Sequence, residues 1–142
     1  MLEKDVVYSK ISIIKNCLKS IEHATGLKPE KLDEIMIQDV FVLNVQRAVQ
    51  ACIDLANIVI SMKGFKLPAS YKQSFQILEE NKIIEPSMAN EMMKMVGFRN
   101  IAVHDYQELD VDILKSILKK HLPGLEKFYT KIYEFVQGEA EG

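Results

Sequence analysis

The chain has 142 residues and a formal net charge of −2, with 48% hydrophobic and 27% charged residues. This composition is typical of one globular domain, and it excludes a disordered chain or a generally basic nucleic-acid-binding surface. No apolar run approaches the roughly 18 residues of a membrane span, and the first residues lack the pattern of a signal peptide. We therefore expect a single cytoplasmic domain over residues 1–137, followed by a flexible tail over residues 138–142.

The first half of the sequence predicts two helices. Apolar residues recur at alternating steps of four and three over about residues 4–24, and Gly26 ends that helix. A longer helix is predicted over about residues 35–63. It carries two apolar stripes, which begin at Phe41 and at Val42. Two stripes predict a central helix with neighbours on two sides.

The second half predicts three more helices and no strand. A short helix is expected over residues 70–80, and Pro86 fits the first turn of the next one. A last helix is predicted over about residues 110–137, with a kink at Pro123 and Gly124. The predicted fold is all-α: an antiparallel four-helix bundle with one short additional helix.

The two cysteines fall within helical patterns. Because no secretory signal is present, Cys17 and Cys52 are expected to be small buried residues and not a disulfide. Two isolated thiols also lack the spacing of metal ligands. The sequence therefore predicts neither a metal site nor a cofactor.

One stretch, residues 97–106, carries residues suited to chemistry. Its helix has an apolar series with alternating steps of four and three, and the series reads Met88, Met92, Met95, Arg99, Ala102 and Tyr106. A guanidinium thus occupies a place where the pattern favours Met or Leu. Because an unpaired buried charge is costly, Arg99 is expected to have a partner or a ligand.

His104 is the second candidate. It follows Arg99 by five residues, about 140° around an ideal helix, so the two side chains cannot share one face. Either the helix loosens near Val103, or another element or another chain completes the site. An imidazole titrates near neutral pH and can act as a general acid or base. A guanidinium can stabilise the charge on a phosphoryl group in the transition state.

These two side chains suit metal-independent RNA cleavage. In that reaction a base deprotonates the 2′-hydroxyl, which attacks the adjacent phosphorus, and an acid protonates the leaving 5′-oxygen. One imidazole cannot be both acid and base at once. A two-fold dimer that places two copies of the motif around one cleft would supply two of each group.

The order Arg99, four residues, His104, one residue, Tyr106 resembles the motif of the HEPN superfamily, in particular the HepT-like toxins paired with minimal nucleotidyltransferase (MNT) antitoxins. Asn100 fits the commoner form of that motif. The resemblance implies a homodimeric endoribonuclease that leaves a 2′,3′-cyclic phosphate. It also implies an MNT antitoxin that adenylylates Tyr106.

Residues 47–57 resemble the long second helix of the same family. Arg47 and Asp54 are seven residues apart and point to the same side of their helix. They are expected to line the cleft and to orient Arg99. The alternative is a surface strip with salt bridges of little energetic weight. Asn100 is expected to be either a donor in the cleft or a helix-surface residue.

Simpler interpretations remain open for the motif. Arg99 could form a structural ion pair with Asp54 or Asp105, His104 could cap its helix, and Tyr106 could be an amphipathic core residue. The expected partners are a second copy, an MNT antitoxin and RNA, with no membrane. The alternative function is a non-catalytic helical partner or nucleotide-binding subunit of a nucleotidyltransferase.

Overall fold

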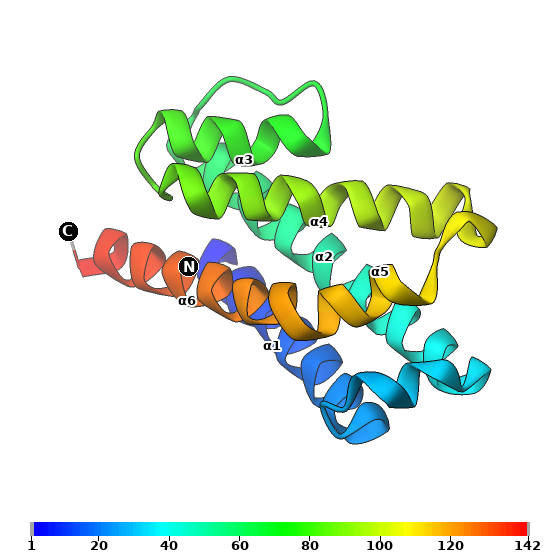
Figure 1. Cartoon of the computed structure of the whole chain (residues 1–142). Coiled ribbons are helices and arrows are strands. Elements are labelled where there is room, and N and C mark those ends of the chain that lie inside the picture. The colour runs from blue at the N-terminus through cyan, green and yellow to red at the C-terminus, as the bar shows by residue number, and fades with distance from the viewer. Residues whose placement is uncertain (1, 142) are drawn as a thin grey trace.

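The computed structural model describes residues 2–141, and the side chains of residues 3–139. The described residues contain no strand, which confirms the all-α prediction. The six α-helices are α1 (Leu2–Thr25), α2 (Ile35–Lys63), α3 (Tyr71–Glu80), α4 (Pro86–His104), α5 (Val111–Ser116) and α6 (Leu122–Glu141) (Figure 1). Three short elements join them: the 3-10 helices η1 (Pro29–Asp33) and η2 (Tyr106–Glu108), and the π-helical turn η3 (Ile117–His121).

The long helix α2 is the centre of the fold. It packs most extensively against α1 and also contacts α3, α4, α5 and α6. Both predicted stripes are buried, the first from Phe41 to Val59 and the second from Val42 to Ile60. Gly64 ends α2 with φ +67°, a left-handed conformation that glycine adopts without a Cβ clash.

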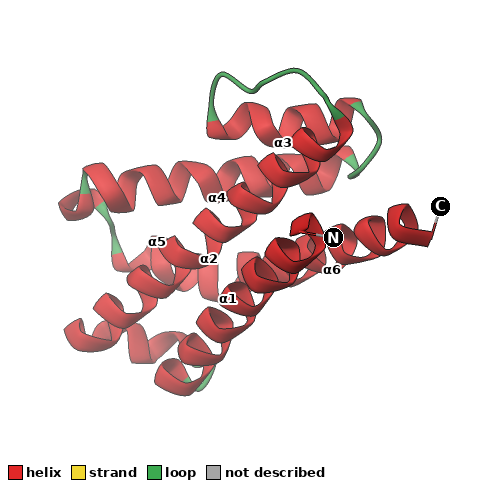
Figure 2. Cartoon of the chain, turned by 180° about the vertical axis from the view of Figure 1, so that it is seen from behind, coloured by secondary structure: helices red, strands yellow, loops and turns green. Residues whose placement is uncertain are grey.

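The helices form the predicted antiparallel bundle. In Figures 1 and 2, α1 runs opposite to α2, and α4 runs opposite to the α5–α6 pair. The short helix α3 packs on α2 and α4 and is the additional helix. Buried residues from all six helices form one hydrophobic cluster. This cluster fixes α4, which carries the candidate motif.

The last predicted helix is interrupted just before Pro123. The N–H of Leu122 donates to the carbonyl of Ile117, a spacing of five residues in place of the usual four. Proline has no N–H, and its ring crowds the carbonyl four residues earlier, so a wider turn is favoured there. The apolar stripe continues through this turn, because Leu118, Leu122, Leu125, Phe128 and Ile132 are all buried.

The last helix extends into the tail predicted over residues 138–142, whose flexibility stays a prediction. Helix α6 continues to residue 141, and residue 142 lies outside the described residues. Glu139 forms an ion pair with Lys63 at the end of α2, and Gln137 Nε2 donates to Tyr8 Oη at 2.9 Å. Residue 139, beyond the predicted boundary, thus contacts the end of α2.

None of the described helices combines the length and the apolar character of a transmembrane segment.

Candidate active site

Arg99 lies half-buried on α4, within the predicted apolar series. Its Nη1 donates to Asn100 Oδ1 at 3.1 Å, and its guanidinium carbon lies 5.1 Å from the centre of the Tyr71 ring. It forms no ion pair with a described side chain, so the structural pairs with Asp54 and Asp105 are not made. Its Nε is buried and has no hydrogen-bond partner among the described residues. Such a donor is costly unless a further group satisfies it.

A pocket of about 540 Å³ lies between α3 and α4, and two of its lining residues, Tyr71 and Asn100, contact Arg99. It is lined by Ala69, Ser70, Tyr71, Lys72, Val96 and Asn100. No acidic residue belongs to this lining. Lys72 Nζ reaches α4 at Gly97. A Cβ atom built on this glycine would lie 3.9 Å from the ammonium nitrogen. Lys72 is the one charged side chain of this lining, so the pocket favours an anionic group such as a phosphate, although the whole chain carries a net negative charge.

His104 is the last residue of α4 and is exposed. The N–H of Asp105 still donates to the carbonyl of Ile101 at 2.8 Å, so the helix does not loosen near Val103. Arg99 and His104 therefore diverge by about 140° on a regular helix. Of the two alternatives drawn from the sequence, the structure favours a site that another element or another chain completes.

Tyr106 does not continue the helix beyond His104. It begins η2 after Asp105, whose φ of −140° and ψ of 53° break the helical path. The side chain is 46% exposed, so it is not a core residue. Its hydroxyl donates a hydrogen bond to Asp39 Oδ1 on α2 at 2.5 Å. The expectation that Tyr106 extends the helical series of Arg99 is thus wrong, because α4 ends two residues earlier.

This hydrogen bond changes the acidity of Tyr106. The bond to Asp39, with a smaller contribution from burial and from the negative charge of Asp39, raises the pKa of Tyr106 to about 12. The neutral phenol is the form that donates, so the bond is present below the usual phenol pKa of about 10. It is lost as the pH rises through about 12.

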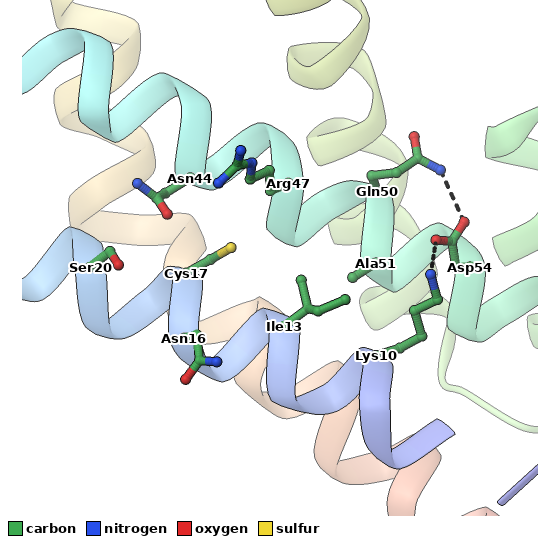
Figure 3. A pocket seen from close by; sticks show the side chains of 10 residues that line it. All are labelled: Lys10, Ile13, Asn16, Cys17, Ser20, Asn44, Arg47, Gln50, Ala51 and Asp54. Atoms are coloured by element: carbon green, nitrogen blue, oxygen red, sulfur yellow. Dashed lines mark hydrogen bonds and ion pairs between the residues drawn. The ribbon is translucent and has the colours of Figure 1, made fainter. Parts of the chain in front are cut away.

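Arg47 and Asp54 lie in a different place from Arg99. Together with Gln50 they line a groove of about 510 Å³ between α1 and α2 (Figure 3). Asp54 forms an ion pair with Lys10 at 2.9 Å and accepts a hydrogen bond from Gln50 Nε2 at 3.0 Å. Arg47 is exposed at the same groove. Within one chain Arg47 and Asp54 form no hydrogen bond or ion pair with Arg99, so the expectation that they orient it is not met there.

Three residues of the site were not found from the sequence. Tyr71 contacts the guanidinium, Lys72 lines the pocket, and Asp39 accepts the bond from Tyr106. Asp39 is 67 residues from Tyr106 in the chain, and nothing in the local pattern pairs them. The aromatic Tyr71 at the start of a short helix is the one signal that could have pointed to the pocket.

Metal-binding side chains do not gather in the described part of the chain. No three residues of the His, Cys, Asp and Glu types lie close enough to hold an ion there. Cys17 and Cys52 are both buried free thiols, as predicted. The ammonium of Lys72 lines the pocket and the guanidinium of Arg99 packs on Tyr71, whereas the imidazole of His104 and the phenol of Tyr106 lie at and beyond the end of α4.

Comparison with known proteins agrees with this arrangement. Residues 14–132 match the family described as ribonuclease HepT-like. The mRNA nuclease HepT of Shewanella oneidensis is 40% identical over 128 residues, which cover 90% of this chain and 96% of that protein. The chain belongs to the HepT-like ribonuclease family, which confirms the resemblance of its motif.

Two solved structures are also similar over nearly the whole chain. One is a toxin–antitoxin crystal structure with AMP-PNP, with a TM-score of 0.85 and 38% identity, covering 90% of this chain and 97% of the other. The second is a tri-AMPylated Shewanella oneidensis HEPN toxin in complex with an MNT antitoxin. It has a TM-score of 0.85 and 39% identity, and the match covers 90% of this chain and 96% of that toxin.

Proposed function

We propose that this protein is a metal-independent endoribonuclease toxin of the HEPN/MNT type. The observation that carries the proposal is Arg99, whose buried Nε lacks a hydrogen-bond partner among the described residues and whose contacts Tyr71 and Asn100 line a pocket together with Lys72. A phosphoryl oxygen of RNA would accept from this guanidinium, and the charge would stabilise the transition state. Asn100 holds the guanidinium through its Oδ1. Such an enzyme meets its mRNA substrate in the cytoplasm.

His104 supplies the acid–base function in this proposal. Because Arg99 and His104 diverge on one regular helix, a second copy brings the complementary groups to the same cleft. Each dimer then holds two imidazoles, one to remove the proton from the 2′-hydroxyl and one to protonate the 5′-oxygen. The cleaved RNA keeps a 2′,3′-cyclic phosphate.

The protein is expected to be a dimer that is joined near the end of α4. Ile101 and Ile113 are 39% and 41% exposed, and both line one groove beside α4. Met92 and Met95 are buried within the chain. Light scattering should give about twice the 16.3 kDa chain mass. Ile113→Lys should weaken the dimer, and Val6→Lys, at a similarly exposed position of α1, should not. A wild-type monomer at micromolar concentration would contradict the proposal.

RNA cleavage is expected to continue in EDTA. The proposed mechanism uses an imidazole and a guanidinium, and no step passes through a metal-bound water. The measurement is the cleavage rate of a labelled RNA with and without an excess of EDTA, after dialysis against the chelator. A loss of activity that Mg²⁺ or Zn²⁺ restores would contradict a metal-independent mechanism.

An MNT antitoxin is the proposed partner, and Tyr106 is the proposed residue that it adenylylates. The structurally similar Shewanella oneidensis HEPN toxin is tri-AMPylated in its complex with an MNT antitoxin. In this chain the Tyr106 side chain is exposed and lies two residues after His104. An AMP on its hydroxyl adds bulk and a negative charge beside the cleft, where both would oppose the binding of an RNA phosphate. The alternative of a non-catalytic partner is not favoured, because the mRNA nuclease HepT of Shewanella oneidensis is 40% identical over 90% of this chain.

A further inference from the structure

The hydrogen bond between Tyr106 and Asp39 has a consequence for the proposed modification. It joins η2 to the first part of α2, and the hydroxyl donates to Asp39 Oδ1 at 2.5 Å. No other described side chain is hydrogen-bonded to this hydroxyl. Because its proton points to Asp39, the lone pairs of Oη point away from that carboxylate. With 46% of the side chain exposed, they are accessible to a donor nucleotide from solvent.

We propose that Asp39 is the residue that accepts the proton of Tyr106 when the first AMP is attached. This inference rests on the proposed function, in which a nucleoside triphosphate donates AMP to Tyr106. A phenol attacks phosphorus poorly while it keeps its proton, and a positioned carboxylate removes that proton as the new bond forms. In the structure Asp39 already accepts the hydrogen bond from that hydroxyl.

The adenylylation step conserves atoms and charge. Tyr106 Oη forms a bond to the α-phosphorus of the nucleoside triphosphate, and the bond from that phosphorus to the bridging oxygen of pyrophosphate breaks. The phenolic proton passes to the Asp39 carboxylate and from there to solvent. Pyrophosphate leaves with the electron pair of the broken bond. No oxidant or reductant is needed.

The experiment compares three variants with the parent protein. Asp39→Asn keeps the size of the side chain and removes its basicity, whereas Asp39→Glu retains a carboxylate. Asp33→Asn is the matched control, because Asp33 is an exposed acid nearby in sequence that pairs with Lys115 at 2.9 Å. All of them, including the parent, carry His104→Ala so that the proteins can be produced without an antitoxin. Circular dichroism establishes that each one is folded.

The readout is the rate of the first AMP addition from ATP by the Shewanella oneidensis MNT antitoxin, followed by mass spectrometry from pH 6 to 9. Asp39→Asn should slow this addition by about 10²–10⁴-fold at pH 7. Its rate should then rise about tenfold per pH unit, because the phenol must ionise by itself below its usual pKa of about 10. The parent should show no such slope, Asp39→Glu should recover part of the rate, and Asp33→Asn should match the parent.

Each contrary outcome has a distinct meaning. If the parent receives AMP on Tyr106 and Asp39→Asn receives it at the same rate, the inference is overturned and the proposed function stands. If Asp39→Asn is slow without the steeper pH dependence, Asp39 only holds the segment in place, and the inference is again overturned. If the parent receives AMP on another residue, the proposed switch fails and the inference fails with it.

Discussion

His104→Ala is expected to lower the rate of RNA cleavage by about 10²–10⁴-fold, the usual effect of losing a general acid–base group. The fold should survive, because His104 is exposed at the end of α4 and has no hydrogen bond or ion pair with a described side chain. The measurement is single-turnover cleavage of a labelled RNA, together with light scattering of the variant. His23→Ala, at an exposed position near the end of α1, is the matched control and should cut normally.

Arg99→Ala should cause a loss of similar size through the missing charge stabilisation. Arg47→Ala is the matched control. Arg47 lines the groove between α1 and α2 and does not line the pocket between α3 and α4. Arg47→Ala should therefore keep most of the activity. Wild-type cleavage by His104→Ala or by Arg99→Ala would show that the motif is not the catalytic centre.

Tyr106→Phe is expected to abolish neutralisation by an MNT antitoxin while leaving most of the nuclease activity. The change removes the oxygen that would accept AMP, and Arg99 and His104 remain in place. It also removes the bond to Asp39, which costs about 1 kcal/mol or less for an exposed pair. The measurement is growth of cells that express the variant with the antitoxin, combined with mass spectrometry of the purified toxin.

The control for this variant is Tyr133→Phe. Tyr133 is 42% exposed, similar to Tyr106, and lies on α6. Cells that express Tyr133→Phe with the antitoxin should grow, and their toxin should carry AMP on Tyr106. Full neutralisation of Tyr106→Phe by covalent AMP on another residue would contradict the proposed switch.

The helices could be predicted because their apolar patterns are long and regular. The two stripes of α2 identified the central helix, and the proline at residue 123 marked the interrupted turn. The residues at which the helices end were harder to predict. The end of α4 falls at the backbone of Asp105, which is not a glycine, and α6 continues past residue 137 to where Glu139 pairs with Lys63. Such contacts join residues far apart in sequence.

The contrast between local patterns and contacts distant in sequence also explains which site residues could be predicted. Arg99 was detectable because a charge interrupts an apolar series within one helix. Arg47 and Asp54 share a helix face, which the sequence predicts, but the neighbour of that face is α1 and not α4. Asp39 and Lys72 reach the site only through the packing of α2 and α3 against the motif segment. Periodicity predicts which residues share a face, and it does not predict which element that face meets.

The most direct measurement of the central claim is the chemistry of the RNA ends. A synthetic RNA that the protein cuts at one position should be cleaved in EDTA and should leave a 2′,3′-cyclic phosphate on the upstream fragment. The same RNA with a 2′-O-methyl group at that position should stay intact, because the attacking hydroxyl is blocked. Cleavage of the methylated RNA, or fragments with a 3′-hydroxyl and a 5′-phosphate, would contradict the account.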